Sequence, residues 1–132
     1  MGTNFCMQKK PCCECGLTPP EVHLGKRSAG WQYHARGYRA GDLDEVLPNA
    51  TVHSLVDLFD MIGRLINKGW HIEDEYGTEY SVDDFKTAVE LTKTWNGSAA
   101  KSPYWDGKAR GYDMSDDAID DEGWSVCYRE FS

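Results

Sequence analysis

Apolar and polar residues alternate in five short segments, and this two-residue period is typical of β-strands. In the first segment, residues 4–8, Phe5 and Met7 share one face and the residues between them share the other. The remaining segments are residues 21–25, 31–38, 70–74 and 123–131. A turn through residues 26–30 joins the second segment to the third, so we expect these two strands to form a hairpin.

Two longer segments repeat apolar residues every three or four positions, which is the period of an amphipathic helix. The first helix is predicted to begin after Ser54, which forms a capping box with Asp57, and to stop at residues 68–69. The second is predicted to begin after Ser81 and to end at residues 96–97. The side chains expected to face the core are Leu55, Leu58, Phe59, Ile62, Leu65 and Ile66 in the first helix, and Val82, Phe85, Val89 and Trp95 in the second.

The order of these elements predicts an α+β fold, with a small antiparallel sheet, a zinc-knuckle-like N-terminal part and two main helices. A chain of 132 residues can bury one ordinary core, so we expect a single domain over residues 1–132. Its predicted parts are a metal knuckle and hairpin in residues 1–38, a helix-strand-helix unit in residues 51–95, a surface loop in residues 98–120 and a closing strand in residues 123–131.

Composition and charge exclude some classes of function. The formal net charge of −8 argues against direct binding of nucleic acid, which depends on Lys and Arg neutralising phosphates. The chain contains no apolar run near the ~18 residues that cross a bilayer, so we expect no membrane span. Residues 1–10 lack the apolar segment of a secretory signal, which predicts a cytoplasmic protein. Acidic residues are concentrated in residues 113–122, where we expect a solvated loop.

The strongest chemical motif is a pair of cysteines, Cys12 and Cys15, separated by two residues. A turn at this spacing can direct both thiolates at one tetrahedral zinc ion. The chain has five cysteines, an odd number, which favours a metal site or free thiols over a framework of disulfides. His23 and His34 offer two imidazoles further along the chain. The candidate ligand set for a structural zinc ion is therefore Cys12, Cys15, His23 and His34.

Other interpretations of these cysteines are also compatible with the sequence. Cys6, Cys13 or a water molecule could take the place of the fourth ligand. The cysteine pair could instead consist of structural thiols without a metal, or form a redox-active dithiol, although no βαβ context surrounds it. If zinc is bound, we expect it to stabilise the fold, because metal binding contributes to folding when the ligands are disordered without it.

A second motif lies in residues 23–31, which concentrate two cations, a hydroxyl group, two glycines and a tryptophan around a predicted turn. Such groups are the components of an anion or nucleotide site. The candidate ligand-binding residues are Lys26, Arg27, Ser28 and Trp31. The segment is not a P-loop, because the upstream glycine is missing and no helix is predicted to follow. The alternative is a polar hairpin turn in which Trp31 anchors the core.

Enzymatic function is disfavoured by the sequence. No set of residues has the order or context of a catalytic triad or a nucleophile elbow, so we assign no catalytic residues. An enzyme would need a pocket that joins His23 or His34 to acidic residues such as Asp74 or Glu75. Binding is therefore the favoured class of function.

Four stretches of the chain together resemble a known group of sequences. They are Gly-Thr-Asn-Phe at residues 2–5, the knuckle at residues 12–16, His-Leu-Gly-Lys-Arg-Ser-Ala-Gly-Trp at residues 23–31 and Asp-Glu-Tyr-Gly at residues 74–77. This pattern is similar to a family of uncharacterised small bacteriophage proteins with a GTN(F/Y) start, a CxxCG knuckle and an H(L/I)GKxSAGW motif. The resemblance implies a viral accessory protein in the host bacterial cytoplasm, which binds a host protein and inhibits host defence or host machinery.

The sequence supports two hypotheses about what is bound. The first is a host protein, bound through an acidic and aromatic surface, because the chain is negatively charged and Trp95 and Trp105 fall in or near predicted loops. The alternative is a small ligand or a nucleotide, bound by the turn of residues 25–31.

Overall fold

The computed structural model describes residues 2–9 and 20–129, and within these ranges the chain forms three α-helices, a mixed sheet of seven strands and a separate pair of strands. The sheet has the spatial order β5-β4-β1-β2-β3-β9-β8. Its strands are β1 (Gly2–Gln8), β2 (Val22–Ser28), β3 (His34–Arg36), β4 (His71–Asp74), β5 (Glu79–Tyr80), β8 (Asp117–Ile119) and β9 (Ser125–Cys127). The predicted α+β class is confirmed.

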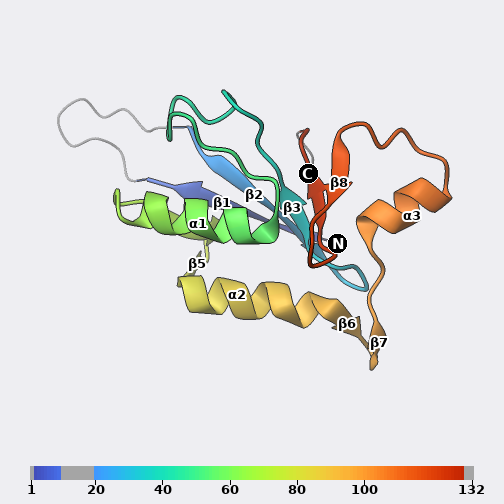
Figure 1. The fold of residues 1–132 in the computed structure, drawn as a ribbon. Coiled ribbons are helices and arrows are strands. Elements are labelled where there is room, and N and C mark those ends of the chain that lie inside the picture. The colour runs from blue at the N-terminus through green and yellow to red at the C-terminus, as the bar shows by residue number, and fades with distance from the viewer. Residues whose placement is uncertain (1, 10–19, 130–132) are drawn as a thin grey trace.

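The helices are distributed unequally around this sheet. They are α1 (Leu55–Ile66), α2 (Val82–Glu90) with its 3-10 extension η1 (Leu91–Lys93), and α3 (Pro103–Ala109); the short hairpin consists of β6 (Thr94–Trp95) and β7 (Ser98–Ala99). Helices α1 and α2 lie against one face of the sheet, whereas α3 lies at the end formed by β8 and β9 (Figure 1). None of the helices in the described part of the chain has both the length and the apolar character needed to cross a membrane.

The core lies between the sheet and the first two helices. Phe5 of β1 is fully buried, and its ring contacts those of Tyr33, Tyr80 and Phe85 at centroid distances of 6.2, 5.2 and 5.2 Å. These contacts join β1 to α2, because Phe85 belongs to that helix. The core side chains of α1 are Leu55, Leu58, Met61, Ile62 and Leu65.

The start of α1 follows the sequence prediction. Ser54 is its N-cap, and the Ser54 hydroxyl accepts a hydrogen bond of 3.0 Å from the backbone N–H of Asp57. The Asp57 carboxylate in turn accepts a hydrogen bond of 3.0 Å from the backbone N–H of His53. Two otherwise unpaired donors at the helix N-terminus are thereby satisfied.

The second helix and the turn of residues 26–30 differ from the prediction. Helix α2 ends at Glu90, and Trp95 belongs to β6 with 51% of its surface exposed, so the prediction that Trp95 faces the core was wrong. Strand β2 continues to Ser28, so the turn is confined to Ala29 and Gly30. Gly30 has a φ of +82°, which glycine adopts without strain, and this explains why the turn falls there.

The predicted surface loop of residues 98–120 was also wrong, because this segment contains β7, α3 and β8. Helix α3 begins with Pro103 after Ser102, an arrangement that suits a helix start because the missing proline N–H would be unpaired there. The helix is short and buries little apolar surface, so it leaves no apolar period in the sequence.

The sheet is mixed, whereas the sequence predicted an antiparallel one. Strand β9 enters the sheet between β3 and β8 and runs parallel to β3, with His34 beside Ser125 and Arg36 beside Cys127. A parallel pair requires a long connection, and here it contains both α1 and α2. The prediction of a closing strand is confirmed in kind, but that strand lies inside the sheet and not at its edge.

Candidate functional site

Three side chains with metal-ligating groups meet at the end of the sheet opposite β5. They are His34 of β3, Asp117 of β8 and Cys127 of β9, and their ligand atoms all lie within 4.8 Å of one another. The His34 side chain is 23% exposed, the Asp117 side chain is 4% exposed and Cys127 is fully buried. The three neighbouring strands each contribute one group, so the cluster is fixed by the sheet itself.

Strand register explains why these residues meet. In the antiparallel β8–β9 pair, Asp117 lies opposite Cys127. In the parallel β3–β9 pair, Arg36 lies beside Cys127, and His34 precedes Arg36 by two residues. Because residues two apart in a strand share a face, His34 joins Asp117 and Cys127 on one side of the sheet.

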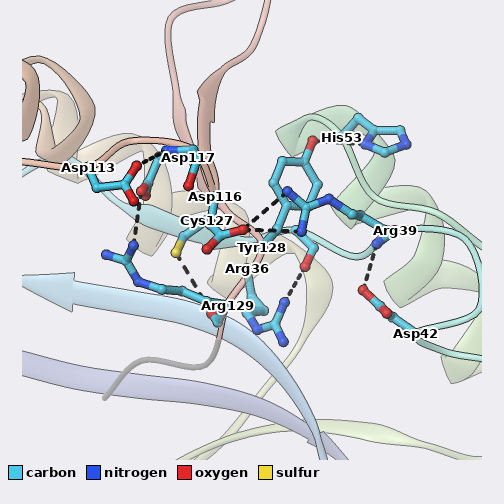
Figure 2. Close-up of polar contacts among 12 residues, drawn as sticks. Arg36, Arg39, Asp42, His53, Asp113, Asp116, Asp117, Cys127, Tyr128 and Arg129 are labelled. Atoms are coloured by element: carbon cyan, nitrogen blue, oxygen red, sulfur yellow. Dashed lines mark hydrogen bonds and ion pairs between the residues drawn. The ribbon is translucent and has the colours of Figure 1, made fainter.

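Arg129 orients the cluster. Its guanidinium Nη1 lies 3.3 Å from Oδ2 of Asp117, whereas Oδ1 of Asp117 lies 3.7 Å from Nε2 of His34. The Cys127 thiol is 3.8 Å from the backbone carbonyl oxygen of Arg129. Figure 2 shows the Arg129 side chain reaching Asp117 and the Cys127 sulfur pointing toward the Arg129 backbone. Arg129 therefore pairs with one carboxylate oxygen of Asp117, and the other oxygen faces His34. In metal sites, neighbouring residues often orient the ligands in this way.

Burial shifts the pKa values of two of these groups. It lowers the pKa of His34, against the opposing effect of the Asp117 carboxylate, so the imidazole is neutral near pH 7. Burial also raises the pKa of the Cys127 thiol, which favours its protonated form. A neutral imidazole is the form that binds a metal, whereas the thiol would lose its proton to a bound cation.

The spacing of the three groups suits a metal ion. In a tetrahedral site with metal–nitrogen and metal–oxygen distances near 2.1 Å, ligand atoms lie roughly 3.4 Å apart. The 3.7 Å between His34 and Asp117 is close to this value, and the Cys127 sulfur lies within 4.8 Å of both atoms. The three residues could therefore hold a metal ion.

Cysteine, histidine and aspartate also occur together in nucleophilic triads, and the burial of Cys127 distinguishes the two cases. A catalytic thiol must be reachable and must ionise readily, because the thiolate is the nucleophile. Cys127 is fully buried and its pKa is raised. The geometry of this cluster therefore fits a ligand set better than a nucleophile.

Of the four metal ligands predicted from the sequence, the structure describes His23 and His34. Cys12 and Cys15 lie outside the described residues, so that half of the prediction stays a prediction. His23 lies on β2, where its Nε2 atom forms a hydrogen bond of 3.0 Å with Oδ1 of Asn4. His34 lies instead with Asp117 and Cys127.

Asp117 and Cys127 were not among the metal ligands predicted from the sequence. The alternation at residues 124–129 predicted a strand containing Cys127, but it did not indicate which strand would lie next to it. Asp117 lies within the acidic segment of residues 113–122, and the sequence does not distinguish it from the other acidic residues there. Ligands that come from three distant strands have no characteristic spacing, whereas a Cys-x-x-Cys pair has one.

The acidic segment is more ordered than the predicted solvated loop. Asp113, Asp116, Asp117 and Asp120 accept hydrogen bonds from backbone N–H groups or pair with arginines. Asp116 lies 3.4 Å from Nη2 of Arg39, whose guanidinium carbon lies 4.5 Å from the ring centroid of Tyr128 (Figure 2). Asp120 accepts a hydrogen bond of 2.9 Å from the backbone N–H of Leu55, at the start of α1. These contacts attach the β8–β9 region to the rest of the molecule.

The predicted ligand-binding residues are divided between the two faces of β2. Lys26 pairs with His34 in the sheet and lines a small hollow of about 170 Å³ together with it. Arg27 lies on the opposite face and lines a different cavity of about 360 Å³. Ser28 and Trp31, which follow in the chain, contribute to both hollows. Lys26 and Arg27 therefore do not converge on one ligand, because neighbouring residues in a strand point to opposite faces.

The pocket that an enzymatic function would need is present, but its groups are engaged in structural contacts. An open hollow of about 950 Å³ is lined by His23, Asp74 and Glu75, among others. Burial favours protonation of Asp74, but hydrogen bonds from the Thr78 N–H, the Tyr80 hydroxyl and the Tyr76 N–H lower its pKa overall. An aspartate held in its ionised form is a poor general acid.

Glu75 is likewise used in the structure, because its Oε1 atom accepts a hydrogen bond of 3.0 Å from the backbone N–H of Asn4. The same asparagine side chain bonds His23. These contacts join the end of β4 to β1 and β2.

Comparison with models of protein families, with curated protein sequences and with solved structures finds no match to this chain.

Proposed function

We propose that this protein binds a zinc ion through His34, Asp117 and Cys127, and that the ion has a structural role. The supporting observation is that each of three adjacent strands supplies one ligating group. Strands β8 and β9 have three residues each, so backbone hydrogen bonds attach them over a short length only. A metal ion shared by β3, β8 and β9 would add the free energy of metal binding to the stability of this end of the sheet.

Zinc is the ion that this donor set favours. Thiolate and imidazole groups suit zinc, whereas magnesium and calcium prefer oxygen ligands. The negative charges of the Cys127 thiolate and the Asp117 carboxylate would neutralise the charge of a divalent ion. Three protein ligands leave a fourth position, which a water molecule fills in many zinc sites.

The zinc content of purified variants tests the proposal. Wild-type protein should retain zinc through gel filtration, whereas Cys127→Ser and Asp117→Asn should each lose an equivalent of it. The matched control is Cys6→Ser, because Cys6 is a cysteine of the same sheet that lies outside the cluster. Cobalt substitution gives a second measurement, since the thiolate–cobalt absorption should decrease in Cys127→Ser and stay unchanged in Cys6→Ser.

The paired change Cys12→Ser with Cys15→Ser separates this site from the one predicted by sequence. If that variant loses all its zinc while Cys127→Ser and Asp117→Asn keep theirs, the metal belongs to the cysteine pair and the proposal is wrong. If the Cys12 and Cys15 changes remove one equivalent of zinc, and Cys127→Ser or Asp117→Asn removes another, both sites bind metal. Far-UV circular dichroism of every variant distinguishes a lost ligand from a lost fold.

A second candidate function is the binding of a host protein through α3 and the turn after it. Trp105 is 53% exposed and Tyr112 is 62% exposed, and the Lys108 ammonium lies 5.5 Å from the Trp105 ring centroid. Aromatic residues are enriched at protein interfaces, and tryptophan often contributes most of the affinity. The acidic charge of the chain would favour a partner with a basic surface.

Affinity measurements on one purified partner would test this second function. The partner would first be captured from bacterial lysate by cross-linking. Trp105→Ala should then weaken its binding by about 30-fold, the effect of losing an interface residue worth about 2 kcal/mol. Tyr76→Ala is the control, because Tyr76 is 68% exposed and follows β4 at the opposite end of the sheet. A partner that binds wild type and Trp105→Ala equally does not use this surface.

A further inference from the structure

A cavity of about 360 Å³ lies between the β2–β3 turn on one side and the end of α2, η1 and β6 on the other. Its wall includes Arg27, Ser28 and Trp31 from the first side and Leu91, Thr94 and Trp95 from the second. Cavities that hold small ligands usually measure about 300–1,000 Å³, so this volume suits one small molecule. The cavity is separate from the candidate metal cluster, none of whose residues lines it.

Two tryptophans give the cavity its aromatic walls. The Trp95 indole lies against the turn, since a methyl group added at Gly30 would be 3.8 Å from Cδ1 of Trp95. Trp95 is 51% exposed and Leu91 is 69% exposed, so both leave apolar surface open to solvent at the cavity. Stacking of an aromatic ring on a tryptophan contributes about 1–3 kcal/mol when the ring is a nucleic-acid base. The wall therefore favours a flat aromatic group over a flexible aliphatic one.

Arg27 adds positive charge to the same wall. Its guanidinium carbon lies 5.8 Å from the ring centroid of Phe5, and the residue lines the cavity. Guanidinium groups bind phosphate through two parallel hydrogen bonds. The hydroxyl groups of Ser28 and Thr94 line the same cavity and can donate further hydrogen bonds.

Thr92, by contrast, is already used by the fold. Its hydroxyl oxygen accepts a hydrogen bond of 2.9 Å from the Tyr33 backbone N–H and its hydroxyl donates one of 2.6 Å to the Val89 carbonyl oxygen. These two bonds connect the end of α2 to the segment before β3, and so fix the two sides of the cavity relative to each other. The cavity is therefore preformed, which limits the entropy lost when a ligand binds.

We propose that this cavity binds a mononucleotide, with the base against Trp31 and Trp95 and the phosphate at Arg27. A nucleoside monophosphate has a flat aromatic base, which the tryptophans would contact, and an anionic phosphate, which Arg27 would bind. This assignment differs from the site predicted by sequence, because it excludes Lys26, which lies on the other face of β2. It adds Trp95, which the sequence predicted to be buried.

Titration calorimetry and tryptophan fluorescence with AMP, GMP, CMP and UMP test the proposal. Arg27→Ala should weaken nucleotide binding by about 10- to 100-fold, the usual effect of losing a hydrogen-bonded charge. Trp95→Ala should weaken it by roughly 5- to 100-fold, through loss of base stacking. Lys26→Ala is the matched control, since it removes the same charge from the next residue on the opposite face and should leave affinity unchanged. Tyr76→Ala controls for the loss of an exposed aromatic ring.

The matching nucleosides and inorganic phosphate serve as separate probes. Both should bind at least about tenfold more weakly than the mononucleotide, because each lacks one of the two recognised groups. The proposal is overturned if no mononucleotide binds the wild type at millimolar concentration, or if Lys26→Ala reduces affinity as much as Arg27→Ala. Equal binding of nucleoside and nucleotide would remove the role of Arg27, and equal binding of inorganic phosphate would remove the role of the tryptophans. Thermal melting of each variant shows whether a loss of binding reflects unfolding.

Discussion

The two faces of the sheet differ in the residues that they carry. Phe5 and Cys6 are neighbours on β1, yet Phe5 is fully buried in the core beneath α1 and α2, whereas Cys6 lines the open hollow on the other face. The helix-covered face is mostly apolar, with Asp74 and Arg27 as charged exceptions. The opposite face carries His34, Asp117 and Cys127, the groups suited to metal binding. The first face holds the core of the fold, and the second holds a group of residues that could bind a metal ion.

Substitution of the neighbours Phe5 and Cys6 gives the largest expected contrast. Phe5→Ala should lower the free energy of unfolding by about 3–5 kcal/mol, because it removes a buried ring and leaves a cavity. Cys6→Ala should lower it by less than about 1 kcal/mol. Urea denaturation followed by circular dichroism measures both values. Similar losses in the two variants would show that the open face contributes as much to stability as the core.

Metal removal should affect the second face alone. With free zinc at 100 times its dissociation constant, binding would stabilise the wild type by about 2.7 kcal/mol, and a chelator should abolish this gain. The same chelator should leave the melting temperature of Cys127→Ser unchanged if the ion is bound by the cluster. A chelator effect of equal size in both proteins would place the stabilising ion elsewhere in the chain.

Asp74 is an exception on the helix-covered face, because its carboxylate is buried there on the same strand face as Ile72. Asp74→Asn should cost about 1–3 kcal/mol at pH 7, since the carboxylate accepts hydrogen bonds from Tyr76, Thr78 and the Tyr80 hydroxyl. Urea denaturation at pH 7 measures this loss. A neutral effect would mean that an amide replaces these bonds fully.

The stability difference between wild type and Asp74→Asn should depend on pH in one direction. The folded protein holds the pKa of Asp74 below its ordinary value of 3.8, so the carboxylate stabilises the folded state above that pH. This contribution is lost as the pH falls through the folded pKa. The difference between wild type and Asp74→Asn should therefore be constant near neutral pH and shrink below about pH 4. A difference that grows on acidification would contradict the assignment.

The smallest expected effect lies in the helical layer, at the cap of α1. Ser54→Ala should cost about 1 kcal/mol, because the Asp57 N–H loses its side-chain acceptor. Ser98→Ala, in the exposed strand β7, should change stability by less than about 0.5 kcal/mol. Thermal melting of both variants measures the difference. Equal melting temperatures would show that water replaces the cap without loss.

The sequence predicted the helix-covered face better than the opposite one. Helix α1 was predicted from its apolar period and from Ser54, both of which are local features. The alternation of Phe5 and Met7 likewise identified the buried face of β1. A helix or strand that packs on a core carries that pattern within its own few residues. The prediction failed at Trp95, where the chain left the helix before its last apolar residue.

The candidate site was much harder to predict, because its members meet only through the order of strands. No local pattern indicates that β9 lies between β3 and β8, and this placement alone brings Cys127 to His34 and Asp117. The placement of Lys26 and Arg27 on opposite faces could have been predicted. It requires only that β2 extend through Ser28, because neighbouring residues of a strand point to opposite faces. The glycines on either side had indicated a turn there instead.

The position of β9 inside the sheet also affects how the chain folds. Until residues 125–127 have been synthesised, β3 can pair only with β2 and its other edge stays unpaired. Unpaired strand edges promote aggregation, so the partly made chain is vulnerable during translation. Contacts between residues far apart in sequence form slowly, which places the docking of β9 late in folding. The sheet and the complete set of His34, Asp117 and Cys127 therefore arise in the same late step.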